Sequence, residues 1–277
     1  MITERNELII EAGRAERQYW HDLWYYRELF YILAWRDLSV RYKQTVIGVA
    51  WAVIRPFLTM IVFTFVFSKI AKLPAPGDVP YPILVFAALL PWQFFSTGLS
   101  ESSNSLIGNA NLISKIYFPR LIIPAGAVVT SFVDFLITLG LMAALMLWYQ
   151  FLPDWRLLLL PAFVILAFAC ALGAGLWLAA LNVKYRDFRY IVPFIVQFGL
   201  YVSPVGFSST IVPERWQFLY SLNPMVGVID GFRWSLLRGA VPLPTGSLIT
   251  AALITAALCA TGVCYFRRTE KTFADVI

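Results

Sequence analysis

Residues 157–181 read LLLLPAFVILAFACALGAGLWLAAL and contain no charged side chain. A helix rises 1.5 Å per residue, so about 20 apolar residues cross the hydrocarbon core of a bilayer. The composition of the whole chain agrees, since 60% of its residues are hydrophobic and 14% are charged. Soluble domains are about 45–50% apolar and about 25% charged. A soluble core of this size could not bury so much apolar surface, so lipid must solvate part of the chain.

Five further stretches are apolar enough, or nearly so, to cross a membrane. We therefore expect an all-α integral membrane protein with six transmembrane helices in one domain, residues 1–277. Small residues at Gly173, Ala174 and Gly175 would let another helix approach the fourth span closely. The expected spans are residues 48–70, 81–99, 121–148, 157–181, 191–212 and 248–266.

The distribution of basic residues predicts the orientation. If the N-terminus is cytoplasmic, fifteen of the 22 Lys and Arg residues fall in inner segments and six in outer segments, and Arg55 lies in the first span. Cytoplasmic loops carry an excess of Lys and Arg. The sequence therefore predicts a multi-pass protein of the bacterial inner membrane with both termini in the cytoplasm.

Residues 216–237 resemble a seventh span but are better explained otherwise. An Asn-Pro pair interrupts them and two charges lie within them, and a seventh span would move the basic C-terminal segment outside. We expect two short helices that dip back from the outer face, within residues 213–240, and call this segment the outer hairpin. Non-helical backbone at such depth must be buried in protein or line a cavity. The residues proposed for an outer gate are Trp216, Asn223, Pro224, Asp230 and Arg233.

The polar N-terminal region, residues 1–45, is expected in the cytoplasm. Within it, residues 20–42 have a broad apolar and aromatic helical face that Arg27 interrupts. Trp and Tyr together with Arg favour a helix lying in the membrane interface. The alternative is a helix that packs on the transmembrane bundle.

The chain lacks the motifs of an enzyme that works alone. It contains no G-x-x-x-x-G-K-[ST] phosphate loop, no H-E-x-x-H and no G-x-S-x-G. His21 is the only histidine, and Cys170, Cys259 and Cys264 lie scattered in apolar runs. Such cysteines form neither a disulfide framework nor a metal site. We predict no catalytic residue, no metal and no cofactor in this chain.

Charge inside the expected spans is sparse. Asp134 is the only acid well inside a span, and Arg55, which precedes Pro56, lies where its side chain can reach the inner surface. An acid at depth is a functional hypothesis by default. Asp134 either takes part in transport or pairs structurally with an Arg or a backbone donor. Ion-driven carriers usually need more ionisable groups, so we expect a partner to supply the energy.

An ordered set of short motifs identifies a family. The chain resembles the type-2 ABC permeases of polysaccharide export from about residue 20 to its end, and within them it is most similar to the O-antigen exporter branch. Capsule and teichoic-acid permeases are relatives of that branch. The motifs are Arg41-Tyr42-Lys43-Gln44-Thr45-Val46-Ile47-Gly48, Trp51, Arg55-Pro56, Pro80-Tyr81-Pro82, Leu90-Pro91-Trp92, Tyr117-Phe118-Pro119-Arg120, Asn223-Pro224 and Phe266-Arg267-Arg268-Thr269-Glu270.

The resemblance implies a homodimer of permeases that works with two separate ABC ATPase subunits, which would hold ATP and Mg²⁺. It implies a lipid-linked surface polysaccharide as substrate, and cytoplasmic coupling helices. The polar loop after the second span should turn at Gly108, and we expect residues 104–115 to form a helix seated in the ATPase. The short charged loop 182–189 would make a second contact; the alternative for both loops is ordinary basic flanking. The candidate coupling residues are Asn104, Ser105, Asn109, Asn111, Lys115, Lys184, Tyr185, Arg186, Asp187 and Arg189.

Aromatic side chains are candidates for the polysaccharide pathway. Sugars stack their apolar faces on rings, and a sliding polymer needs contacts weak enough to release it. The candidates are Trp51, Trp92, Phe95 and Tyr201, although in this aromatic-rich chain such residues commonly serve packing. Two other function classes remain open: a small-molecule or drug permease of the same family, and an integral membrane enzyme acting on glycans.

Overall fold

The computed structural model describes residues 16–43 and 49–273. Every regular element in these ranges is a helix. In chain order they are α1 (Glu16–Tyr25), α2 (Arg27–Lys43), α3 (Val49–Thr64), the π-helical η1 (Phe65–Ile70), α4 (Tyr81–Gly108), α5 (Ala110–Ile113), α6 (Ile122–Trp148), η2 (Trp155–Leu159), α7 (Leu160–Lys184), α8 (Phe188–Val202), η3 (Ser209–Ile211), α9 (Glu214–Ser221), α10 (Pro224–Leu236), α11 (Thr245–Thr269) and η4 (Glu270–Thr272).

Five helical segments in the described ranges are long and apolar enough to cross a membrane. They correspond to five of the six expected spans. The expected fifth span, 191–212, is wrong as one helix, because α8 ends at Val202. Ser203 is extended, with ψ 152°, and precedes Pro204. Proline disfavours helical backbone in the residue before it, so α8 is only about 22 Å long.

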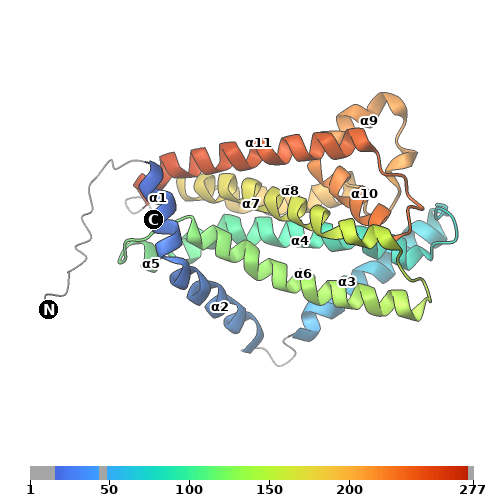
Figure 1. The fold of residues 1–277 in the computed structure, drawn as a ribbon, viewed down its shortest axis with the longest axis horizontal. Helices are drawn as coiled ribbons and strands as arrows, with labels where there is room; N and C mark the ends of the chain where they lie inside the picture. Colours follow the sequence, from blue (N-terminus) through green and yellow to red (C-terminus); the bar gives the residue numbers. More distant parts are fainter. Residues whose placement is uncertain (1–15, 44–48, 274–277) are drawn as a thin grey trace, which may run out of the picture.

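Helix α4 is the central element of the bundle. It packs against α6 and α7 along its length and also touches α3, α8 and α10 (Figure 1). In the most apolar 18-residue stretch of α4, 72% of the residues are buried, whereas the corresponding share for α3 with η1 is 11%. An apolar core surrounds α4 toward its N-terminus, and a second, smaller core joins its C-terminal end to α6, α7 and the end of α11.

Glycines on α7 permit the close packing that its sequence predicts. A Cβ placed on Gly173 would lie 2.7 Å from the backbone nitrogen of Cys259 on α11. A Cβ on Gly175 would lie 2.5 Å from the Ser102 hydroxyl on α4. The expected close approach is confirmed, and both neighbours belong to the same chain.

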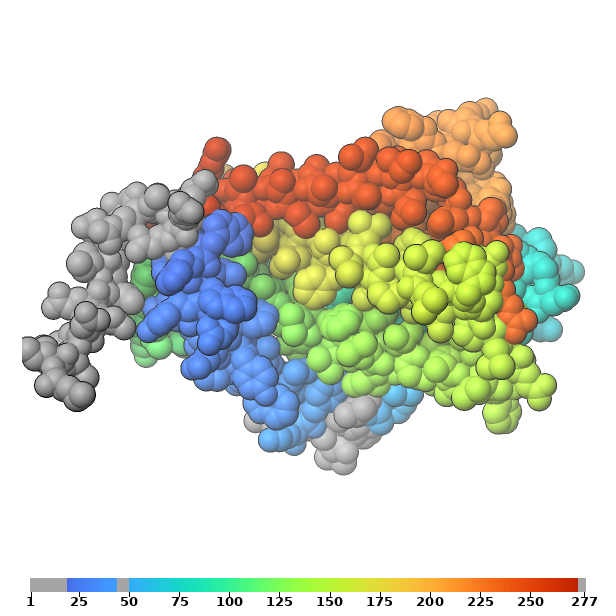
Figure 2. Space-filling view, in the orientation of Figure 1, coloured from blue at the N-terminus to red at the C-terminus, as the bar shows by residue number. Residues whose placement is uncertain are grey.

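The N-terminal helices lie against the side of the bundle. Residues 20–42 are helical as expected, with a break at Tyr26 between α1 and α2. Leu33 and Ala34 are buried, and α2 packs against α6. The opposite side of these helices exposes large aromatic side chains, among them Trp24 and Trp35. Figure 2 shows α1 (dark blue) at the end opposite to α9, with α2 continuing from it along the outside of the molecule.

The segment from 213 to 240 forms two short helices, as predicted. Helix α9 is largely exposed, whereas α10 is buried along most of its length. The break falls at Leu222–Asn223, where the Asn223 side chain accepts a hydrogen bond from the Met225 backbone nitrogen at 3.0 Å and caps α10.

Candidate functional site

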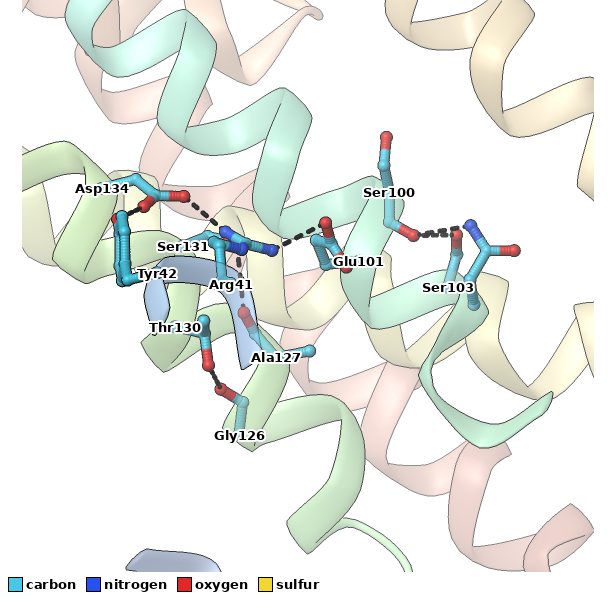
Figure 3. A network of polar contacts seen from close by, with 11 residues as sticks. Arg41, Tyr42, Ser100, Glu101, Ser103, Gly126, Ala127, Thr130, Ser131 and Asp134 are labelled. Atoms are coloured by element: carbon cyan, nitrogen blue, oxygen red, sulfur yellow. Dashed lines mark hydrogen bonds and ion pairs between the residues drawn. The ribbon is translucent and has the colours of Figure 1, made fainter. Parts of the chain in front are cut away.

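Asp134 in the middle of α6 is held by the end of α2. Its carboxylate accepts hydrogen bonds from the Arg41 guanidinium and from the Tyr42 hydroxyl (Figure 3). Arg41 also forms an ion pair with Glu101 on α4, with Nη2 and Oε1 2.8 Å apart. One arginine therefore ties α2 to both α6 and α4.

This network changes the expected position of the N-terminal helix. Asp134 lies twelve residues beyond Ile122, about 18 Å along α6. The end of α2 reaches that level, so α2 runs obliquely along the bundle rather than across its end (Figure 1). The structure therefore shows the packing alternative for the inner face of α2, and Asp134 is engaged in a structural pair.

Asp134→Asn should loosen α2 from the bundle. Hydrogen bonds to a charged group contribute about 1.5–3 kcal/mol. The uncharged asparagine amide would weaken the bonds from Arg41 and Tyr42, because both are strengthened by the charge of the carboxylate. Hydrogen–deuterium exchange of α2 should rise by about tenfold or more. Asp37→Asn is the matched control, because that exposed acid pairs only with the adjacent Arg36 in the described structure. Unchanged exchange in Asp134→Asn would contradict the anchoring role.

Arg55 lies on the exposed face of α3. Its side chain makes no hydrogen bond or ion pair to residues 16–43 or 49–273, although its carbonyl accepts a bond from the Thr59 hydroxyl at 2.8 Å. It does not join the Asp134 network, so the two charges expected inside the spans act separately.

The loop between α4 and α6 does not form one helix over residues 104–115. Helix α4 ends at Gly108 as predicted, and α5 is a single turn. The expectation of one helix over 104–115 is wrong, because Asn109 leaves helical geometry with φ −112° and ψ 22°. Its amide donates to the Ser105 carbonyl at 2.9 Å, and its side-chain oxygen accepts from Arg36 of α2 at 2.7 Å.

The candidates on this loop divide into two groups. Asn104 and Ser105 make hydrogen bonds within the chain, to the Ser100 and Ser102 carbonyls at 2.9 and 2.7 Å. Asn111 and Lys115 are exposed. Asn104 is exposed as well, whereas Ser105 is half-buried. Asn111 and Lys115 are therefore available to another subunit, while Asn104 and Ser105 also shape the end of α4.

The second loop presents its charges to solvent. All five candidates there are exposed. Lys184 ends α7, and its ammonium lies 5.2 Å from the centre of the Tyr185 ring. The exposed candidates on this loop are Lys184, Tyr185, Arg186, Asp187 and Arg189.

A buried asparagine joins the bases of the two loops. The Asn182 side-chain nitrogen donates to the Ser103 carbonyl at 2.9 Å and to the Asn104 side-chain oxygen at 3.1 Å. The interpretation of the sequence did not select Asn182 as a site residue. The available signal was a single amide at the end of a long apolar run, where a buried polar group needs a partner.

Near the same two loops, a second group of contacts joins the beginning and the end of the described chain. The Tyr19 hydroxyl donates to Glu270 at 3.0 Å, and Arg120 donates to the Glu270 carbonyl. The Arg267 guanidinium stacks over the Tyr19 ring at 4.5 Å. Burial, and then the Glu270 carboxylate, raise the pKa of Tyr19 above its ordinary value. The end of α11 thus holds α1 against the loop that precedes α6.

The four pathway aromatics occupy different environments. Trp51 and Tyr201 are exposed, at 56% and 65%. Phe95 is half-buried, with its ring 5.8 Å from that of Trp92. Trp92 is buried against α8, where a Cβ on Gly199 would lie 2.6 Å from its ring. Of these four candidates, Trp51 and Tyr201 are the two whose rings are exposed in the single chain and could contact a polymer.

Helix α8 carries an aromatic stripe that the sequence interpretation found only in part. Its exposed rings recur at intervals of four, four and three residues, which places them on one face of a helix. Phe194 and Phe198 are 66% and 59% exposed and stack with their planes 11° apart. That spacing was the signal available beforehand. The α8 stripe comprises Tyr190, Phe194, Phe198 and Tyr201.

The outer hairpin contains an exposed half and a buried half. Trp216 on α9 is 51% exposed, whereas Asp230 and Arg233 on α10 are fully buried. Pro224 begins α10 directly after its Asn223 cap. No group of three His, Cys, Asp or Glu side chains in the described part of the chain is arranged to hold a metal ion.

Comparison with known proteins identifies the family of this chain. Residues 28–237 match the family described as ABC-2 type transporter. The O-antigen export system permease protein RfbA of Myxococcus xanthus is 31% identical over 214 residues, covering 76% of this chain and 81% of the relative. A protein of that name from Klebsiella pneumoniae is 26% identical over 258 residues, covering 93% and 98%. The polysialic acid transport protein KpsM of Escherichia coli is 21% identical over 213 residues, covering 74% and 80%. As its motifs predicted, the chain belongs to the ABC-2 type transporter family.

Proposed function

We propose that this chain is the membrane permease of an ABC exporter that moves a lipid-linked surface polysaccharide of the O-antigen type across the inner membrane. The observation that carries this proposal is the similarity, over most of the chain, to export permeases named for O-antigen. A separate ATPase subunit hydrolyses ATP with Mg²⁺, and the permease itself is not an enzyme. Capsule export is the second candidate, because the polysialic acid transport protein is also similar, at lower identity.

The proposed membrane arrangement has six spans, with α8 and the segment after it as the fifth. Both termini lie in the cytoplasm, and α9 and α10 form a re-entrant hairpin at the outer face. The exposed aromatic side of α1 and of the first part of α2 lies in the cytoplasmic interface, and the end of α2 continues obliquely toward Asp134. This assignment is supported by the excess of basic residues in the inner segments and by exposed Trp and Tyr on those helices.

The proposed coupling surface consists of the two inner loops. Asn111 and Lys115 would touch the ATPase from the first loop, and the exposed charges of 184–189 from the second. Asn182, by bonding to Ser103 and Asn104, would make the two contacts move together. ATP-driven closure of the partner could then shift α4 and α7 as one unit, which requires an element with two arrangements.

Neutralising the second loop should weaken ATPase binding. The double variant Arg186→Gln, Arg189→Gln removes two exposed charges, and we expect about tenfold less ATPase to co-purify, since charge pairs across an interface contribute roughly 1.5 kcal/mol or more. The control is Arg215→Gln, an exposed arginine on α9 at the opposite end. Equal co-purification of both variants would remove this loop from the coupling surface.

The polymer pathway is proposed along the α8 stripe and Trp51, which would face a second copy of the permease in a homodimer. Both α3 and α8 are poorly covered within one chain, and their exposed rings offer rigid surfaces for stacking on sugars. Trp92 and Phe95 would support α8 from behind.

Deletion of the gene tests the proposed function. Loss of surface polysaccharide with accumulation of lipid-linked polymer inside the cell is expected, and a plasmid copy of the gene should restore export. Intact surface glycans with altered resistance to small hydrophobic compounds would favour a drug permease. Loss of polymer without inner accumulation would favour a membrane enzyme that builds the glycan.

A further inference from the structure

Between α8 and η3 the chain passes through residues 203–207, which we call the outer strap. Its residues from Ser203 to Gly206 are buried, yet they belong to no helix. Buried backbone polar groups outside regular structure need partners from other backbone groups, side chains or water. Here the Ser203 nitrogen donates to the Gly199 carbonyl at 2.9 Å and the Val205 nitrogen to the Ser203 carbonyl at 2.7 Å. The strap therefore has a fixed position only as long as its carbonyl groups are held.

Arg233 of α10 supplies two of these partners. Its Nη2 donates to the Val205 carbonyl at 2.9 Å and its Nη1 to the Phe207 carbonyl at 2.7 Å. Its Nε donates to the Leu84 carbonyl of α4 at 3.3 Å. The planar fork of a guanidinium can make such bonds at the same time, which an ammonium cannot reproduce. A single buried side chain thus fastens the strap to α4 and α10.

Two further side chains contact the strap. The Tyr81 hydroxyl donates to the Gly206 carbonyl at 2.9 Å, and the Asn223 amide donates to the Ser203 hydroxyl at 2.9 Å. Gly206 lies against the Phe67 ring, which a Cβ would approach to 2.2 Å. The strap is thereby the point where α8, the outer hairpin, η1 and the start of α4 meet.

Asp230 lies one turn before Arg233 on the same helix and is also fully buried. Neither of its carboxylate oxygens makes a hydrogen bond within the described residues, and the same holds for the buried Tyr220 hydroxyl. A buried carboxylate without donors is costly, so a guanidinium one turn away is a natural partner for it.

We propose that Arg233 is a positioning residue with two alternative sets of acceptors. In this structure it donates to the strap and holds the outer end of α8 in place. When the strap is released, the guanidinium turns to Asp230, and α8 and the hairpin can separate from α4. The proposal rests on the proposed function, because it assigns this exchange to the opening of the outer end of the export pathway.

The exchange can be followed at Val205, whose side chain is fully buried while its carbonyl makes the contact. A single Val205→Cys is placed in a chain whose three native cysteines are replaced by alanine, in membranes that hold the full exporter with its ATPase. Labelling by a small polar thiol reagent is measured with and without ATP. The substitutions compared are Asp230→Asn, Arg233→Lys and the control Asp154→Asn, whose acid pairs with Arg156 at 2.6 Å elsewhere in the chain.

Turnover should accelerate labelling, and Asp230→Asn should reduce this acceleration about fivefold or more, at the lower end of typical couplings between sites. Arg233→Lys should give fast labelling without ATP, and Asp154→Asn should behave as the unsubstituted chain. Unchanged or faster labelling in Asp230→Asn would overturn the exchange, because Asp230 would then only neutralise a buried cation. That result stands even if Arg233→Lys fails to fold. Export by the same complexes is assayed in parallel, so failure of the proposed function appears in the unsubstituted complex.

Discussion

Replacing Phe194 and Phe198 together by alanine is expected to lower polysaccharide export at least about tenfold while the complex with the ATPase still assembles. An aromatic contact contributes about 0.5–1.5 kcal/mol, and about 1.4 kcal/mol corresponds to a tenfold change in rate, so losing two rings accounts for such a loss. Both rings are exposed in the single chain, so the substitution removes no core packing. Export is measured as surface polymer in a deletion strain that carries the variant.

The control for this prediction is Trp148→Ala at the end of α6, a ring that is 83% exposed and lies outside the α8 stripe. It should leave export close to normal. If the double variant exports as well as this control, the stripe faces lipid alone and the pathway lies elsewhere.

Gly173→Ala is expected to destabilise the fold strongly. The added Cβ would lie 2.7 Å from the Cys259 nitrogen and 2.9 Å from the Leu258 carbonyl carbon, and backbone atoms of α11 cannot move aside as a side chain would. Overpacking of this kind costs about 1–3 kcal/mol. Thermal unfolding of the purified permease in lipid nanodiscs should therefore occur several degrees lower.

Gly140→Ala on α6 is the matched control, because a Cβ there meets nothing within 4 Å. Alanine favours a helix over glycine by about 1 kcal/mol, so this variant should be as stable as the natural chain or more so. A Gly173→Ala protein that unfolds at the same temperature as Gly140→Ala would show that α7 and α11 are not tightly packed.

The helices were predictable where a single local signal dominates. Long apolar runs predicted five spanning segments, four of them to within a few residues, whereas α4 continues to Gly108, beyond the expected span 81–99. The pair Asn223-Pro224 predicted the break between α9 and α10. The fifth span was misjudged, because hydropathy continues past Val202 whereas Pro204 ends helical geometry. In the first loop, the polar run suggested one helix, but Asn109 bonds back to Ser105 and breaks it.

Contacts between residues far apart in the sequence could not be predicted from a single sequence. Asp134 was recognised as unusual, but its partner Arg41 lies 93 residues away and belonged to a helix expected in the interface. Asp230 and Arg233 were selected as charges of the hairpin. The acceptors of Arg233 are backbone carbonyl groups of the strap, and their positions cannot be predicted from the types of side chain there. Side-chain chemistry thus identified the unusual residues, and the tertiary structure identified their partners.

The measurement that tests the proposed export most directly is transport by purified components. The permease and its partner ATPase are reconstituted together in vesicles loaded with lipid-linked polysaccharide on the ATPase side. We expect polymer to appear on the opposite side in an ATP-dependent way. This transport should be abolished when the ATPase cannot hydrolyse ATP and strongly reduced by the double variant Phe194→Ala, Phe198→Ala. ATP hydrolysis with no movement of polymer, in vesicles where a small hydrophobic compound is transported instead, would contradict the proposed export.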